Sequence, residues 1–377
     1  MSSRIEPVVI ADVLFVTTKS VRDPLIAKQH LDVLRRTNRR LTVFSIETSS
    51  EMLLDGAIDA RPTIWDGVSR RSYWTAVLRQ GFKVAQFARR CQSTTFVWYR
   101  AVHSTLGFAM LRVYGRSGCV RHVFDPRGVA SLETRRGARV LAAAESWTMR
   151  RADLTIVTIP TMAAWAISSG AKRVELLRNV GVGSEVQLPP GWSVGQRLNV
   201  AYVASTEGWH ALDACAQWIA VLREHFAAAG VHASAFIRGH MDPDRLATVA
   251  ATFDHTEFDV PIEEMERRLS RCHVGISMIL PTPAKVIAAS PVKVSDYLSV
   301  GLVPFCNEEL PGHQFLSENG QVGILVPLYP QHAGPQDLAH ALDELQRLLL
   351  RSTPPDREKH RAAETAAAVD KALEELA

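Results

Sequence analysis

The sequence predicts an α/β protein built from two doubly wound, Rossmann-like domains that face each other across a cleft. Apolar segments of strand length alternate with amphipathic helical segments through the first half of the chain. The alternation stops at residues 181–196, which are rich in Gly, Pro and Ser, and then starts again. Such alternation is typical of parallel sheets covered by helices. The length of 377 residues suits two domains.

The expected strands are short and rich in Val, Ile, Leu and Phe, and the helices between them repeat apolar residues at helical spacing. The expected strands are 13–17, 41–46, 94–99, 120–124, 154–159, 198–203, 233–237, 273–279, 302–306 and 322–326. The expected helices are 24–36, 73–90, 103–114, 130–151, 210–228, 261–271, 291–300 and 335–350.

The break in the pattern sets the expected domain boundaries. We expect an N-terminal domain over residues 1–182, a linker over 183–197 and a C-terminal domain over 198–354. A final helix is expected within residues 355–377, which are rich in Ala and Glu after a double proline.

Composition and charge exclude several classes of protein. The net charge of +4 suits an acidic ligand or an anionic surface but is too weak to indicate nucleic-acid binding. Five scattered cysteines without a Cys-x-x-Cys pair indicate a reduced, cytoplasmic compartment. No apolar run approaches the roughly 20 residues that cross a bilayer, and the first residues do not read as a signal peptide. We therefore expect a cytoplasmic protein that at most contacts the inner membrane face peripherally.

The stretch SPVKVSDYLSVGLVPF, residues 290–305, reads as a helix followed by a strand. Ser290 is a good N-cap, Pro291 suits the first helical position, and Gly301 suits the position just past the helix. The stretch follows the expected strand 273–279 and a loop. The helix therefore starts beyond the carboxyl end of a strand, where ligands bind in doubly wound sheets.

This helix start has the chemistry of an anion site. Its free amides attract negative charge, and Lys293 in the first turn and Lys285 in the loop add cations, which together suit a diphosphate. Asp296, one turn deeper, offers a carboxylate to two adjacent ribose hydroxyls. The alternative is an ordinary ion pair between Lys293 and Asp296 on a solvated helix face.

The order Ser-Pro-Val-Lys-Val-Ser-Asp-Tyr at residues 290–297, continuing to Pro304, resembles the donor-site signature of retaining glycosyltransferases with the GT-B fold, in the family 4-like, bacterial-type group 1 glycosyltransferases. Residues 124–128, Phe-Asp-Pro-Arg-Gly, with Glu133 resemble the Asp-x-Arg-Gly motif of that family. Residues 151–153, Arg-Ala-Asp, stand before an expected apolar strand and resemble the Arg-Ala-Asp segment of that family. The similarity spans most of the chain.

The resemblance implies a retaining, metal-independent hexosyltransferase with no cofactor. Its donor would be a nucleotide-diphosphate sugar, and its acceptor a glycan, a lipid-linked molecule or a small molecule. The last helix would pack back on the first domain. The expected donor-binding residues are Ser205, Arg238, Lys285, Ser290, Lys293 and Asp296. The expected catalytic residues, at strand ends of the first domain, are Arg100, His103 and Arg127.

Two departures from the signature keep other functions open. Ala288 stands where the family usually has a Glu that contacts the donor sugar. Residues 204–208 lack the Arg and Lys that many relatives aim at the diphosphate, so Lys285, Lys293 and Arg238 would supply the charge. The alternatives are a non-catalytic GT-B protein that binds sugar nucleotides, and a GT-B-fold sugar-nucleotide epimerase or hydrolase.

Several candidates also have ordinary structural interpretations. Arg127 can pair with Glu133, His103 can be a surface or capping group, and Arg238 can be a solvated strand end. A basic cluster is either a solvated face or a patch that rests on anionic lipid: Arg35, Arg36, Arg39, Arg40, Arg89 and Arg90.

We expect no protein-held metal. Asp242 of the one Asp-x-Asp triplet is better explained as a helix N-cap before Pro243 than as a metal ligand. The histidines also lack metal-ligand spacing.

Overall fold

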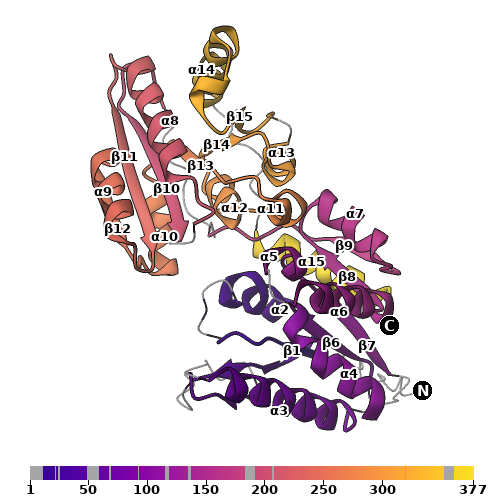
Figure 1. Ribbon diagram of the computed structural model, residues 1–377. Helices are drawn as coiled ribbons and strands as arrows, with labels where there is room; N and C mark the ends of the chain where they lie inside the picture. The colour runs from indigo at the N-terminus through magenta and orange to yellow at the C-terminus, as the bar shows by residue number, and fades with distance from the viewer. Residues whose placement is uncertain are drawn as a thin grey trace, which may run out of the picture. The chain divides into compact units, whose positions relative to one another are not determined.

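The computed structural model describes most of the chain (Figure 1). The described residues are 12–21, 23, 26–48, 59–67, 69–91, 93–114, 119–134, 137–182, 192–205, 208–318, 320–351 and 361–377. They belong to two compact units, one of residues 1–177 with 365–377 and one of residues 178–364. Most of the linker expected over 183–197 lies outside the described residues.

The first unit is built on a parallel sheet of seven strands in the order β4-β2-β1-β6-β7-β8-β9. The central strands are almost entirely buried, and they read as continuous apolar runs because sheets of this kind are covered on both faces. The strands are β1 (Asp12–Val16), β2 (Arg40–Phe44), β4 (Asp59–Ala60), β6 (Thr95–Arg100), β7 (Val120–Asp125), β8 (Leu154–Val157) and β9 (Val174–Leu176), with the separate pair β3 (Ile46–Glu47) and β5 (Thr63–Ile64).

The helices of the first unit include one from the far end of the chain. Arg39 Nε donates to Asp370 of the last helix (2.9 Å), and Arg121 Nε donates to the Leu376 carbonyl (2.9 Å). These bonds fasten the C-terminal segment to the first unit. The helices are the π-helical turn η1 (Ala27–Leu31), α2 (Asp32–Arg35), α3 (Arg70–Ala88), the 3₁₀ turn η2 (Val102–Ser104), α4 (Thr105–Tyr114), α5 (Ala130–Glu133), α6 (Ala138–Arg151), α7 (Pro160–Ser168) and α15 (Ala362–Glu374).

Two helix predictions in this unit need correction. The single helix predicted over 130–151 is divided into α5 and α6, with Gly137 before α6 at φ +79°, a conformation that favours glycine. The helix predicted over 24–36 is a π-helical turn followed by one short α-helix, and residues 24 and 25 lie outside the described residues.

The second unit has a parallel six-stranded sheet in the order β12-β11-β10-β13-β14-β15. The strands are β10 (Leu198–Ser205), β11 (Val231–Arg238), β12 (His255–Phe258), β13 (Val274–Ser277), β14 (Val303–Asn307) and β15 (Ile324–Val326). The chain winds outward from β10 to β12 and then outward from β13 to β15 on the other side. The order therefore reverses between β10 and β13, which is where doubly wound sheets bind ligands.

The helices of this unit surround a core that includes Trp218, Tyr202 and Phe305. They are α8 (Leu212–His225), α9 (Pro243–Thr252), α10 (Ile262–Leu269), α11 (Pro283–Ala288), α12 (Val292–Ser299), α13 (Pro311–Leu316), the 3₁₀ turn η3 (Pro330–His332) and α14 (Pro335–Leu349). The predicted α/β class with two doubly wound, Rossmann-like sheets is confirmed.

Tyr297 fixes α12 to the sheet at the reversal point. Its ring packs on Gly275 of β13, where a Cβ atom would lie 2.2 Å from the ring. Its hydroxyl accepts from the Val203 amide of β10 (3.0 Å) and donates to the Ile276 carbonyl of β13 (3.1 Å). The helix that carries Lys293 and Asp296 is therefore held against both strands of the reversal.

Candidate functional site

The start of α12 differs from the prediction by one residue. Pro291 rather than Ser290 is the N-cap, and no side chain caps the helix. The reason is that Ser290 has another partner: Asn179 Nδ2 donates to the Ser290 carbonyl (2.7 Å) and to its Oγ (3.1 Å). Nearby, Gly181 lies directly on α12, because a Cβ atom there would be 2.3 Å from the Ser295 carbonyl oxygen.

The loop expected before α12 contains the short helix α11. Thr282 is its N-cap and accepts from the Lys285 amide (3.4 Å), and Pro283 occupies the first helical position. Lys285 is therefore placed by a helix. Its ammonium lies 4.6 Å from the centre of the Trp209 ring, in cation–π range.

Lys293 of α12 is buried, with 7% of its surface exposed. Its ammonium nitrogen lies 2.9 Å from Nδ1 of His210 and 5.2 Å from the centre of the Tyr202 ring. Within the part of the chain that the structure describes, it has no ion pair. Burial lowers the pKa of Lys293 from 10.5 to about 8, against a smaller opposite effect of the thiols Cys215 and Cys306.

The contacts of His210 define its protonation state. An ammonium group only donates, so Nδ1 of His210 accepts from Lys293, and the ring hydrogen sits on Nε2. Nε2 lies 3.1 Å from Ser205 Oγ and donates to it, whereas the Ser205 amide is farther away, at 3.4 Å. Burial lowers the pKa of His210 strongly, and the cations of Lys293, Arg245 and Lys285 lower it further. The imidazole is therefore neutral.

Trp209 and His210 join the two lysines. Their ring centres are 3.8 Å apart, with Lys285 over the indole and Lys293 at the imidazole. The segment is fixed because His210 forms an antiparallel bridge with Ile279, just after β13. One short segment after β10 thus brings together cations from α11 and α12.

Two arginines of the same unit are further candidate cations. Arg245, in the first turn of α9, acts on the pKa of both His210 and Tyr202 and so lies near them. Arg238 is exposed at the end of β11, in register with Ser205 of β10. Sequence spacing indicated Arg238 as a candidate but did not indicate Arg245.

Asp296 is also buried, with 7% exposed. Its Oδ1 accepts from the Val182 amide at 3.0 Å. Because Lys293 and Asp296 are both buried, they are not an ion pair on a solvated helix face. The carboxylate has a structural partner that sequence spacing did not reveal.

A second cluster lies at the ends of β6 and β7 in the first unit. Asp125 is buried, and its carboxylate accepts from Trp98 Nε1 (3.3 Å) and Arg127 Nε (2.9 Å) and lies 2.9 Å from His30 Nε2. Burial alone would raise the pKa of Asp125, but Arg127 and His30 together hold it well below its usual range. Burial, with help from Arg127, lowers the pKa of His30 to about 4.

Arg100 belongs to the same cluster. Burial lowers the pKa of Arg100. Asp125 opposes this effect, and Arg127 adds to it. Its Nε is buried and has no hydrogen-bond partner among the described residues. Ala101 and Arg127, each just beyond a strand end, have φ of +63° and +54°. Such strain in non-glycine residues is concentrated at functional sites.

His103 has different neighbours. Its ring meets the edges of Trp74 (5.6 Å between centres) and Tyr73 (6.4 Å), both from α3. Of the three expected catalytic residues, the structure therefore groups Arg100 with Arg127 around Asp125 and packs His103 on α3.

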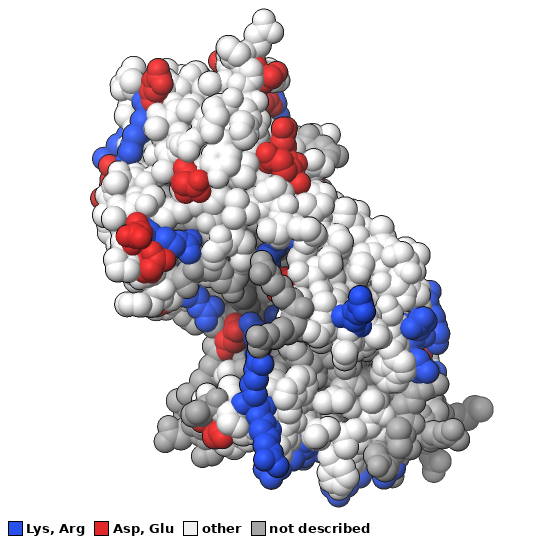
Figure 2. Space-filling view, in the orientation of Figure 1, with Lys and Arg blue, Asp and Glu red and all other residues white. Residues whose placement is uncertain are grey.

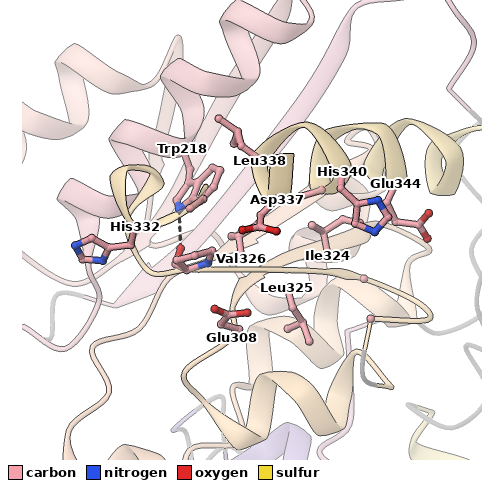
Figure 3. A pocket seen from close by; sticks show the side chains of 15 residues that line it. Trp218, Glu308, Ile324, Leu325, Val326, His332, Asp337, Leu338, His340 and Glu344 are labelled. Carbon is pink, nitrogen blue, oxygen red and sulfur yellow. Dashed lines mark hydrogen bonds between the residues drawn. The ribbon is translucent and has the colours of Figure 1, made fainter. Parts of the chain in front are cut away.

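A cavity of about 530 Å³ in the second unit is lined by residues of α8, β15 and α14 (Figure 3). Its lining includes the carboxylates of Glu308, Asp337 and Glu344 and neither Lys285 nor Lys293. Carboxylates repel a diphosphate, so this cavity does not suit the expected donor.

The interpretation of Asp242 as an N-cap is confirmed: its side chain accepts from the Arg245 amide (3.0 Å), and Pro243 is the first residue of α9. Among the described residues, no group of three or more His, Cys, Asp or Glu side chains is arranged to hold a metal ion. No helix in the described ranges is long and apolar enough to span a membrane.

The sequence matches no protein-family model and no curated protein. Solved structures share the fold across 97% of this chain. They include a sucrose-phosphate synthase from Thermosynechococcus elongatus (13% identity, 96% of that chain, TM-score 0.62) and a UDP-forming α,α-trehalose-phosphate synthase from Burkholderia xenovorans in complex with glucose-6-phosphate (11%, 100%, 0.64). A third is a trehalose-6-phosphate synthase studied for glycosyl transfer with retention (11%, 99%, 0.62). The fold is therefore GT-B, and membership of family 4 stays a prediction.

Five residues of the two clusters escaped prediction from sequence: Trp209, His210 and Arg245 near the lysines, and His30 and Trp98 around Asp125. One signal was present for the first two, because an aromatic residue and a histidine follow the end of β10, where doubly wound folds bind ligands. No signal in one sequence links His30 to Asp125, because 95 positions separate them.

Proposed function

We propose that the protein is a glycosyltransferase that moves a sugar from a nucleoside-diphosphate sugar to an acceptor, with the donor bound by the second unit. One observation carries this proposal: the ammonium of Lys293 is buried, with a neutral imidazole as its hydrogen-bond partner. A buried cation without a counterion is costly, and an anion that binds beside it offsets the cost.

A diphosphate fits the surroundings of Lys293. Lys285 and Arg245 add positive charge beside His210, and Lys293 lies in the first turn of α12, whose free amides attract anions. These groups would stabilise the negative charge that develops on the leaving diphosphate, without a metal ion. The UDP-forming structural neighbour makes UDP the nucleotide to test first.

The remaining donor residues take roles that follow from their positions. Ser205 orients His210, and Ser290 accepts hydrogen bonds from Asn179 at the start of α12. Arg238, exposed beside Ser205, is available to the diphosphate or the base. Asp296 keeps the ribose role that the resemblance implies, in addition to its bond with a backbone amide.

The acceptor side of the proposal rests on the first unit. Arg100 and Arg127 place two guanidinium groups near the carboxylate of Asp125, and Asp23 also acts on Arg100. These two arginines are the candidate contacts for an acceptor phosphate or for the reacting oxygens. His103 stays a candidate contact for the acceptor. The neighbour in complex with glucose-6-phosphate makes a sugar phosphate the first acceptor to test, and the neighbour studied for retention supports a retaining reaction.

The experiment is incubation of the protein with UDP-glucose, with and without a panel of acceptors that includes glucose-6-phosphate. The expected result is release of UDP that depends on an acceptor, together with a new glycoside of retained configuration. Acceptor-independent release of UDP, or a change in the sugar, would indicate a hydrolase or an epimerase instead.

Ala288 favours one alternative specifically, because it brings no carboxylate to the place where the resembled family contacts the donor sugar. On that alternative the protein binds nucleotide sugars without turning them over. Binding of UDP-glucose without any product across the acceptor panel would support it.

A further inference from the structure

Helix α3 of the first unit presents an apolar stripe to solvent. Trp74, Leu78 and Phe82 are 42%, 48% and 50% exposed. They are spaced four residues apart, so they lie on one side of the helix. Large apolar side chains grouped in this way on a surface mark an interaction site more often than scattered ones do.

The opposite side of α3 holds the helix in place, and of the three stripe residues only Trp74 has a ring contact within the described part of the unit, with Tyr73 and His103. Ala76, Val77 and Val84 are buried. Gly81 lies so close to α4 that a Cβ atom on it would be 2.9 Å from the Gly107 Cα atom. The exposed stripe is therefore a rigidly supported surface.

The charged side chains on α3 and on the two residues after it are all cations. Residues 70–90 include five arginines, one lysine and no Asp or Glu, and every one of these cations is exposed. Figure 2 shows blue Lys and Arg atoms along the lower margin of the view, the region where Figure 1 places α3. Four of the cations have no ion pair in the described part of the chain: Arg70, Arg71, Arg79 and Arg90.

The basic cluster expected from the sequence is only partly the same surface. Three of its arginines pair with aspartates of the first unit, so their charges are compensated there. The pairs are Arg36 with Asp32 (3.2 Å), Arg39 with Asp370 (2.9 Å) and Arg40 with Asp12 (2.6 Å). Arg89 and Arg90 follow α3 directly and remain part of the new surface.

We propose that this face of α3, defined by Trp74, Leu78 and Phe82 and the flanking cations, binds the surface of an anionic lipid bilayer. Helices that lie in a membrane interface combine Trp, Phe and Leu on one side with Arg and Lys beside them. Each cation near anionic headgroups strengthens binding about fivefold. Three apolar side chains are a small area beside the roughly 800 Å² per partner of a stable protein interface, so a lipid surface fits better than a protein.

This surface goes beyond the proposed function, because it concerns where the protein works rather than what it binds as donor. It would hold the first unit, which carries Arg100 and Arg127, close to acceptors that are anchored in a membrane or produced at one.

The test is co-sedimentation with vesicles of phosphatidylcholine alone and of phosphatidylcholine mixed with phosphatidylglycerol. The protein should sediment with the anionic vesicles at low salt, lose binding as sodium chloride rises, and ignore the neutral vesicles. The triple variant Trp74→Ser, Leu78→Ser, Phe82→Ser should lose at least about tenfold in binding. The double variant Arg71→Gln, Arg79→Gln should lose about 25-fold.

Matched controls come from the same unit. Val140→Ser with Ile167→Ser removes exposed apolar side chains, and Arg139→Gln with Lys172→Gln removes exposed charges, so both should bind vesicles as the parent does. The proposal is overturned if the parent does not sediment with anionic vesicles, or if controls and α3 variants lose binding equally. A dimer by light scattering that only the α3 variants abolish would overturn it as well and assign the stripe to a second copy of the chain. Calorimetry with UDP measures binding at the donor site separately. A negative result with vesicles therefore leaves the proposed function untouched.

Discussion

The ammonium nitrogen of Lys293 lies 2.9 Å from Nδ1 of His210, although the two residues are 83 positions apart in the chain. The contact joins the first turn of α12 to the segment after β10, at the reversal point of the second sheet. It also requires a neutral His210, because a charged imidazole could not accept from an ammonium. The pair therefore holds one positive charge, on Lys293, and the proposed function assigns this charge to the diphosphate of the donor.

Replacement of Lys293 by Met should stabilise the folded protein while it removes a binding group. The fall of the Lys293 pKa from 10.5 to about 8 corresponds to on the order of 3 kcal/mol of destabilisation by the buried charge. Loss of the His210 hydrogen bond offsets part of this, so we expect a net gain of about 1–2 kcal/mol at pH 7. Urea unfolding measures the difference. A destabilised Lys293→Met protein would show that the buried lysine supports the fold.

The stability difference between parent and Lys293→Met should depend on pH. The folded protein holds the Lys293 proton less tightly than the unfolded chain does, so the parent becomes more stable as pH rises from about 8 toward 10.5. The advantage of Lys293→Met should therefore be constant below pH 8 and shrink above it. Urea midpoints at several pH values check this, and an advantage that does not change with pH contradicts a buried, titrating amine.

Trp209 should act through Lys285 rather than through the fold alone. Trp209→Leu removes the ring that faces Lys285 and stacks on His210, so UDP affinity should fall about tenfold. Trp209→Phe keeps an aromatic face and should recover most of the affinity. Calorimetry with both variants separates the roles, because equal affinities for the Leu and Phe variants would mean that the ring only fills space.

Asp296→Asn tests the ribose role with the backbone contact preserved, since an amide oxygen also accepts from the Val182 amide. Affinity for UDP should fall by about tenfold or more, while affinity for inorganic diphosphate should hardly change. Asp296→Ala removes the backbone bond as well and should also lower the melting temperature. Equal losses for UDP and diphosphate would assign Asp296 an electrostatic or purely structural role.

In the proposed mechanism, Lys293, Lys285 and helix amides supply the charge at the leaving group. Transferase activity should therefore survive excess EDTA. Asp242→Ala should cost about 1 kcal/mol of stability through loss of the N-cap of α9 and should leave turnover unchanged. Activity that disappears with EDTA and returns with magnesium or manganese would refute the metal-free account.

The regular parts of the fold were predictable and the irregular parts were not. The expected strand 198–203 is an apolar run between turn residues, so its pattern is local, and it predicted β10 correctly. The break between α5 and α6 depends on the conformation of Gly137, which the surrounding helical pattern hides. Serine commonly caps helices, yet the carbonyl and hydroxyl oxygens of Ser290 accept hydrogen bonds from Asn179, a residue 111 positions away.

The candidate site shows the same division. Lys293 and Asp296 could be named as candidates because they fall within one recognisable helix start. His210 and Trp209 were not named as candidates, because their place beside the lysines depends on a bridge to Ile279 that only the folded sheet creates. The residues around Asp125 likewise come from separate strands and helices, so their grouping is not visible in the sequence.

The central claim is that Lys293 binds the diphosphate of a nucleotide donor, and calorimetric titration of UDP into the parent and Lys293→Met proteins tests it most directly. We predict measurable binding to the parent that weakens by up to about tenfold per pH unit above pH 8, as Lys293 loses its proton. Lys293→Met should bind at least about a hundredfold more weakly, without that pH dependence, while remaining folded. Equal affinity of the two proteins for UDP would contradict the account.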